Sequence, residues 1–265
     1  MKRNHHSIYT TELSKGQGAV DETLTLLQVW EPGMPRDVLA RKILAEGALS
    51  RSTAVRTRDL VQRVFARRYL TNGGAPAANL KYLVEHHADR SVIKQIMLIY
   101  TSRLHLILRD FIAEVYWNRY SAGAERISRS DADEFIFRAQ SDGRIAPPWS
   151  ESMRLRVARY LTGTLADFEF LEESKQASRA LRPFRLLAGT GLYLTHEIHF
   201  TGFSDNSILE SPDWKLFGLA RRDVVQELNR LTTNGHFIMQ YSGDLLRIAW
   251  RYQTMEECLD AIARR

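Results

Sequence analysis

The chain has 265 residues, which is enough for one large domain or two small ones. Hydrophobic residues make up 44% of it and charged residues 26%, and this profile excludes a disordered, collagen-like or disulfide-stabilised chain. A net charge of +6 indicates an anionic partner. The single cysteine, Cys258, excludes an internal disulfide and a thiolate metal site, and such a chain suits the reducing cytoplasm.

Neither a secretory signal nor a membrane span is expected. The basic N-terminus is followed by no apolar stretch of the kind a signal peptide needs. A spanning helix needs about 20 largely uncharged residues. The most apolar segment, 92–117, fails this test because it contains Lys94, Arg103, His105, Arg109, Asp110 and Glu114. We therefore expect a cytoplasmic protein that does not enter a membrane.

Apolar residues at helical spacing predict three helices in the first 70 residues. They cover 20–30, 35–47, and a segment that is capped by Ser50 or Ser52 and runs to about residue 69. Two or three more helices are expected before residue 120. Together they predict an N-terminal helical domain, 1–120, that resembles a helix-turn-helix domain.

The pattern then changes to helix, turn, helix and ribbon. Helices at 131–140 and 150–164 precede β-rich runs near 168–171 and 184–187. This order is typical of a winged-helix module, which we predict over 121–188.

A similar order recurs at the C-terminus, over 189–265. A helix at 220–233 precedes two β-rich runs that are separated by Ser-Gly-Asp, which predicts a β-hairpin over 236–251. Thr254 and Glu257 form the capping box of a last helix. The predicted fold is therefore mainly α with small β-hairpins: a helix-turn-helix-like domain followed by two winged-helix-like modules.

The excess positive charge lies between residues 34 and 70. Nine basic and three acidic residues there differ by +6, which equals the net charge of the whole chain. Eight of the nine are arginines, whose planar forks suit phosphates and the guanine edge. In a regular helix Arg56, Arg63 and Arg67 share one face, beside an N-terminus that favours a phosphate. This pattern is typical of a DNA-recognition helix, but a solvated basic face without a ligand has the same composition.

The second module carries a weaker version of this pattern, on its second helix and in its expected wing. Acidic neighbours dilute the charge there, and for the third module we favour packing or partner binding. The candidate DNA-binding residues are Arg51, Ser52, Thr53, Arg56, Arg58, Arg63, Arg67, Arg154, Arg156, Arg159, Lys175 and Arg179.

No catalytic motif is visible. The chain has no phosphate-binding glycine loop and no G-x-S-x-G nucleophile elbow. His196 and His199 are only three residues apart, a spacing that favours a hydrogen-bonded pair over a zinc site. We therefore expect a protein that is not an enzyme, with no catalytic residues, no metal, no cofactor and no small-molecule substrate.

Scattered positions make the chain resemble the BrxA family of the BREX bacteriophage-defence systems, proteins once described as inner-membrane proteins. The matching pieces include Tyr9-Thr10 near the start, Trp149-Ser150-Glu151-Ser152 in the second half, and the phenylalanine-rich segment 167–171. The resemblance covers most of residues 8–187. The tail from Gly202 is similar to that of longer family members.

The resemblance implies a mostly helical fold with winged-helix-like parts, and binding to double-stranded DNA. It also implies work beside other BREX components: a methyltransferase, an ATPase and a phosphatase-like protein. We therefore expect a non-enzymatic DNA-binding component of such a system that contacts mainly phosphates. Two alternatives remain open: an RNA-binding protein similar to NusB, to which the family has been compared in fold, and a protein-assembly adaptor within the defence complex.

Overall fold

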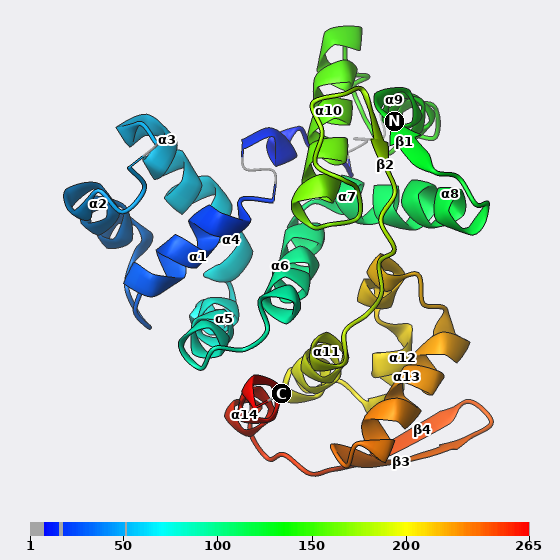
Figure 1. The fold of residues 1–265 in the computed structure, drawn as a ribbon. Coiled ribbons are helices and arrows are strands. Elements are labelled where there is room, and N and C mark those ends of the chain that lie inside the picture. Colours follow the sequence, from blue (N-terminus) through cyan, green and yellow to red (C-terminus); the bar gives the residue numbers. More distant parts are fainter. Residues whose placement is uncertain (1–7, 16–17, 51, 265) are drawn as a thin grey trace, which may run out of the picture. The chain divides into compact units, whose positions relative to one another are not determined.

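A computed structural model describes residues 8–15, 18–50 and 52–264, and it is mainly helical (Figure 1). Helices hold 64% of the described residues. In the described part of the chain, the strands form two antiparallel sheets of two strands each. The prediction of a mainly α chain with small β elements is therefore confirmed.

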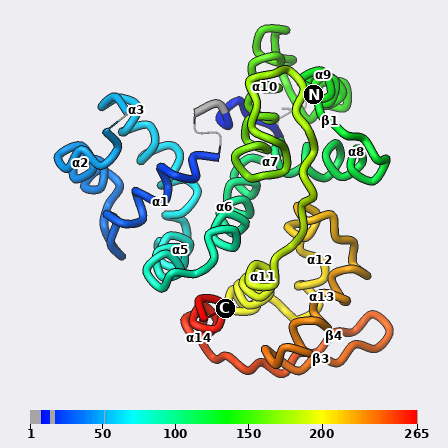
Figure 2. Tube along the Cα trace, in the orientation of Figure 1, coloured from blue at the N-terminus to red at the C-terminus, as the bar shows by residue number. Residues whose placement is uncertain are grey.

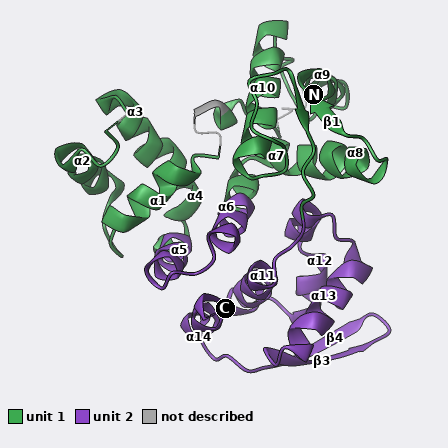
Figure 3. Ribbon diagram, in the orientation of Figure 1, with its two compact units in different colours: residues 1–74, 100–184 green, residues 75–99, 185–265 purple. Residues whose placement is uncertain are grey.

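The chain forms two compact units, and each is built from two separate stretches of sequence (Figure 3). Unit 1 comprises residues 1–74 and 100–184, and unit 2 comprises residues 75–99 and 185–265. Figure 2 lets the reader follow the path, which leaves unit 1 after residue 74 and returns to it within helix α6 (Arg90–Leu104).

This division differs from the three consecutive ranges expected from the sequence, 1–120, 121–188 and 189–265. The reason is packing between distant segments: helix α5 (Ala75–Glu85) packs against helix α14 (Met255–Ala263), which in turn packs against α11 (Ala188–Phe200). Long-range packing of this kind leaves no local signal in the sequence.

Unit 1 begins with a short 3-10 turn, Glu12–Lys15, and a cluster of three helices. These are α1 (Val20–Val29), α2 (Arg36–Glu46), and a long third helix that consists of α3 (Ala54–Asp59), a π-helical segment (Leu60–Phe65) and α4 (Ala66–Tyr69). A 3-10 turn, Asn72–Gly74, comes next. The predicted buried stripe of the third helix is confirmed: Leu60, Val61, Val64 and Phe65 are all buried.

Two details of the third helix differ from the prediction. Its cap is Thr53, whose hydroxyl accepts a bond from the Arg56 N–H at 3.2 Å, and not Ser50 or Ser52. The π-helical segment also holds more residues per turn than the 3.6 of an α-helix, and each extra residue rotates the later side chains by about 100° around the helix axis. The seven-residue spacing therefore does not align Arg56 with Arg63 and Arg67 as it would in a regular helix.

The second stretch of unit 1 starts with the last residues of α6 and continues through helices and a small sheet. Its elements are α7 (Leu106–Phe111), a π-helical segment (Ile112–Tyr116), α8 (Trp117–Ser121), β1 (Arg126–Ser128), α9 (Arg129–Ser141), α10 (Glu151–Asp167) and β2 (Ser178–Ala180). Ser150 caps α10 as predicted. The prediction of strands near 168–171 and 184–187 was wrong, because β1 pairs with β2 and Leu171 contributes only one bridge, to Leu181. The apolar run at 168–171 instead fills the core after the end of α10.

Unit 2 contains α5, α6 up to residue 99, and α11. The chain then forms α12 (Asp205–Glu210), a 3-10 helix (Pro212–Phe217), α13 (Arg221–Thr233), β3 (Phe237–Ser242), β4 (Leu245–Trp250) and α14. The predicted hairpin is confirmed, with Ser242 paired to Leu245 across a two-residue turn. Thr254 caps α14 by accepting from the Glu257 N–H as predicted, but the Glu257 carboxylate accepts from the Gln253 N–H, so the predicted capping box is only half formed.

No helix within the described ranges is both long and apolar enough to cross a membrane. Within the same ranges, no three His, Cys, Asp or Glu side chains gather in a way that would hold a metal ion.

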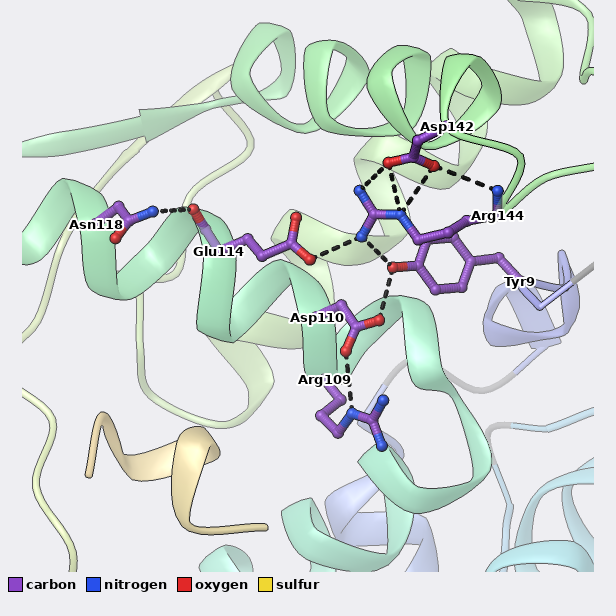
Figure 4. Close-up of polar contacts among 7 residues, drawn as sticks. All are labelled: Tyr9, Arg109, Asp110, Glu114, Asn118, Asp142 and Arg144. Atoms are coloured by element: carbon purple, nitrogen blue, oxygen red, sulfur yellow. Dashed lines mark hydrogen bonds and ion pairs between the residues drawn. The ribbon is translucent and has the colours of Figure 1, made fainter. Parts of the chain in front are cut away.

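Tyr9 joins the N-terminal segment to the rest of unit 1 through charged partners (Figure 4). Its hydroxyl donates to Asp110 Oδ2 at 2.7 Å and accepts from Arg144 Nη1 at 2.7 Å. Arg144 also contacts Glu114 and Asp142, and its carbonyl oxygen accepts from the Tyr9 N–H. The phenol thus connects α7 with the turn after α9, and Arg144 extends this connection to the π-helical segment through Glu114.

We expect Tyr9→Phe to lower the free energy of unfolding by about 2 kcal/mol, because both lost bonds involve charged groups that are mostly shielded from water. Urea unfolding followed by circular dichroism measures this change. Tyr120→Phe is the matched control, since it removes a hydroxyl from a side chain that is 40% exposed. Equal unfolding midpoints for the two variants would contradict the prediction.

Candidate nucleic-acid interface

The arginine-rich segment presents an exposed basic surface on α2 and the third helix, which pack together. We call it the first basic surface; it consists of Arg36, Arg41, Lys42, Arg56, Arg58, Arg63 and Arg67, all at least partly exposed. Three acidic residues accompany these seven cations (Asp37, Glu46 and Asp59), so the described part of this segment has a local excess of 7 − 3 = +4 before Arg68 is counted.

Arg68 does not belong to this surface. Its side chain is 2% exposed, and its Nη1 donates to the carbonyl oxygen of Gly18 at 3.0 Å. The ninth basic residue, Arg51, lies outside the described residues. Ser52 is half-buried, and its hydroxyl has no hydrogen-bond partner among the residues that the structure describes.

Two of the arginines predicted to bind DNA form ion pairs with carboxylates on the surface. Arg63 Nε lies 3.2 Å from Asp59 Oδ1, and Arg67 Nη1 lies 2.5 Å from Glu12 Oε2. All four side chains are at least 40% exposed. Exposed pairs of this kind stabilise a protein by about 0–1 kcal/mol. The exchange of a carboxylate for a phosphate at either arginine therefore costs little.

The arginines of α10 divide into one that faces inward and two that face outward. Arg154 Nε lies 3.0 Å from Asp133 Oδ1 on α9, with its guanidinium over the Phe137 ring and its side chain 19% exposed. Arg156 and Arg159 are exposed. The three arginines of α10 that were predicted to bind DNA therefore do not form one continuous exposed row.

Three of the residues predicted to bind DNA line one pocket of unit 1, although they come from a helix, a loop and a strand. Arg159 of α10, Lys175 of the loop and Arg179 of β2 line a pocket of about 740 Å³. Sequence reasoning missed a fourth cation there, Arg129, the first residue of α9. Pairing of β1 with β2 brings it close, and no local pattern in the sequence reveals that pairing.

Comparisons with known proteins identify a family and a fold. The sequence model of the BrxA family matches residues 7–197, which is more than half of the chain. No curated protein matches the chain. The crystal structure of an uncharacterized protein from Magnetospirillum magneticum is similar with a TM-score of 0.56 and 18% identity, over 72% of this chain and 94% of that one. At that identity the similarity shows the fold alone.

Proposed function

The chain belongs to the BrxA family, which implies a BREX-associated role in phage defence, and we propose that it acts there as a non-enzymatic protein that binds double-stranded DNA. The observation that carries the proposal is the first basic surface, where seven cations lie on two packed helices. Contacts to phosphates position a protein on a duplex without reading its sequence. Binding is therefore expected to be tolerant of sequence and sensitive to salt.

The order of elements after residue 106 supports a second anchor. Helix α8 is followed by β1, the packed pair α9 and α10, and two short extended segments. The second of these, β2 with its extension, lies between the other two: Leu181 N–H donates to Glu125 O, while Arg182 N–H donates to Phe170 O. This order is similar to that of a winged-helix module, with the single bridge at Leu171 in the place of one strand.

In such a module α10 is the helix that enters the major groove, and the loop before β2 is the wing. Arg156 and Arg159 then contact phosphates from α10, and Lys175 does so from the wing. Arg154 supports α9 through Asp133 instead. Both anchors belong to unit 1, and two anchors on one duplex raise the affinity through effective concentration.

A salt titration tests the proposal. The logarithm of the binding constant for a duplex is expected to fall linearly with the logarithm of salt concentration, by about 0.9 for each phosphate neutralised. The double variant Arg56→Gln/Arg58→Gln should flatten this slope by about 1.8. We also expect about tenfold weaker binding near 50 mM salt. Fluorescence anisotropy with a labelled duplex measures both quantities.

The matched control is Arg222→Gln/Arg247→Gln, which removes two exposed charges from unit 2. It should leave the slope close to that of the unchanged protein. An equal loss in both double variants would assign binding to net charge rather than to the first basic surface. Displacement of the duplex by structured RNA at lower concentration than by unlabelled duplex would favour RNA binding, and no binding near 50 mM salt would favour the adaptor alternative.

A further inference from the structure

The pocket of unit 1 is lined by cations from separate elements. Arg129, Arg159, Lys175 and Arg179 contribute four positive charges, and Asp167 and Glu173 contribute two negative ones. The formal charge of the lining is therefore 4 − 2 = +2. Its volume of about 740 Å³ lies within the range of pockets that hold small organic ligands.

The fold places the Nε atom of Arg179 where it lacks an acceptor among the described residues. Arg179 is paired with Ile127 across the β1–β2 ladder, and directly paired residues lie on the same face of a sheet. Ile127 is completely buried, so this face is turned towards the interior. Arg179 Nε is accordingly shielded from solvent, and it has no hydrogen-bond partner in the described part of the chain. A buried donor of this kind is costly unless an acceptor is supplied.

The other cations are held around this group. The Arg129 N–H donates to Ala177 O at 2.8 Å, and its Nη2 donates to Lys175 O at 3.3 Å, so Arg129 braces the loop that carries Lys175. On the facing helix, Arg159 lies one turn before Gly163, which has no side chain to fill the space. Helix α10 thus contributes Arg159, Gly163, Ala166 and Asp167 to the lining, and Arg129, the loop 173–175 and Arg179 contribute the rest.

The acidic residues weaken the positive charge only in part. Asp167 Oδ2 accepts the Gly18 N–H at 2.8 Å, which directs that oxygen to the backbone. Burial also raises the pKa of Asp167, so its charge is less strongly favoured than that of a free carboxyl. Glu173 is exposed to water, and its charge is screened there.

We propose that this pocket binds a phosphomonoester, carried either by a free nucleotide or by the 5′ end of a nucleic-acid strand. A phosphomonoester carries about −1.5 to −2 at pH 7, which balances the lining charge of +2. A carboxylate or a bridging phosphodiester carries only one negative charge. Arginine forks also match phosphoryl oxygens in geometry, and a phosphoryl oxygen supplies the acceptor that Arg179 Nε needs. The site lies outside the first basic surface but shares Arg159 and Lys175 with the second anchor proposed above, so it is tested with a mononucleotide, whose binding needs no duplex.

Calorimetric titration of the full chain with adenosine monophosphate tests the proposal. We expect saturable binding that Arg179→Gln weakens by about tenfold or more, as for loss of a charge-assisted bond. Arg138→Gln is the control, because Arg138 is an exposed arginine of unit 1, on α9, that neither lines the pocket nor belongs to a proposed anchor. Lys175→Gln, in an exposed loop position, provides a second variant if Arg179→Gln alters folding.

Two comparisons separate the sources of the phosphoryl group. Displacement of the nucleotide by a 5′-phosphorylated duplex at a lower concentration than by its 5′-hydroxyl counterpart identifies a strand end as the ligand. Displacement by neither, or by both at the same concentration, identifies a free nucleotide, since a duplex on the second anchor covers Arg159 and Lys175 with or without a 5′ phosphate. The proposal is overturned if adenosine binds as tightly as its monophosphate, if no saturation occurs in the millimolar range, or if Arg138→Gln weakens binding as much as Arg179→Gln and Lys175→Gln do.

Discussion

Alanine in place of Gly18 is expected to lower the free energy of unfolding by about 3 kcal/mol, because both sides of this glycine are occupied. A Cβ atom added there would lie 2.5 Å from the Cβ of Asp167, a distance that requires the backbone or α10 to move. Such a shift also stretches the bond from Gly18 N–H to Asp167 and the bond from Arg68 Nη1 to Gly18 O. Gly18 thereby joins the α4 end of the first basic surface to α10.

Urea unfolding followed by circular dichroism measures the effect, with Gly123→Ala as the control. A Cβ added at Gly123 meets no atom within 4 Å, and the residue has a φ of 72°. That variant should therefore lose only the preference of glycine for a left-handed backbone, about 1 kcal/mol. If Gly18→Ala is no less stable than Gly123→Ala, then the close approach to Asp167 does not constrain the fold.

Structure that depends on neighbouring residues could be predicted from the sequence. The caps at Ser150 and Thr254 and the two-residue turn after Ser242 involve bonds that span only a few residues. Their residue types have that preference in any protein. The buried stripe of the third helix is a consequence of helical periodicity in the same way.

Pairing between distant residues could not be predicted. Strands β1 and β2 are three residues each and lie about fifty residues apart, so neither has the alternation that indicates a strand. The apolar run at 168–171 has a more strand-like sequence than β1 or β2 has. It is apolar because it fills the core after the end of α10. Arg129 was missed as a pocket residue for this same reason.

One buried arginine was detectable in principle. Arg68 lies four residues after Val64 and three after Phe65, so a helix wheel places it on the buried stripe and away from the solvent face. The charge of the segment 34–70 includes Arg68 together with the exposed arginines, although Arg68 is only 2% exposed. The π-helical segment, in contrast, has no signal in the sequence, and it breaks the alignment expected for Arg56, Arg63 and Arg67.

Acidification below pH 6.5 is expected to destabilise both units, because each buries a neutral histidine. In unit 1, His105 is 5% exposed, and burial together with the charges of Arg68 and Arg67 lowers its pKa from 6.5 to about 3. In unit 2, His196 is completely buried beside Phe237, Trp250 and Tyr252, and burial lowers its pKa from 6.5 to about 4. Both rings therefore resist protonation in the folded chain.

The sign of the effect depends on which state binds the proton first. Between pH 6.5 and pH 4 the unfolded chain protonates these histidines and the folded chain does not, so the stabilisation present above pH 6.5 is lost as the pH falls. For His196 the pKa difference corresponds to about 3 kcal/mol. For His105 it corresponds to about 5 kcal/mol, of which about 3 kcal/mol is lost by pH 4.

Comparison of pH slopes between variants isolates each histidine. His196→Gln keeps a polar side chain but cannot titrate, so the free energy of unfolding of unit 2 should fall less steeply from pH 8 to pH 4.5 than in the unchanged protein. His105→Gln should do the same for unit 1, and all other titrating groups are common to each pair of proteins. Because unit 1 and unit 2 need not unfold together, each transition is fitted separately. If the slopes of variant and unchanged protein coincide, the two histidines are protonated equally in the folded and unfolded chains, and burial does not hold them neutral.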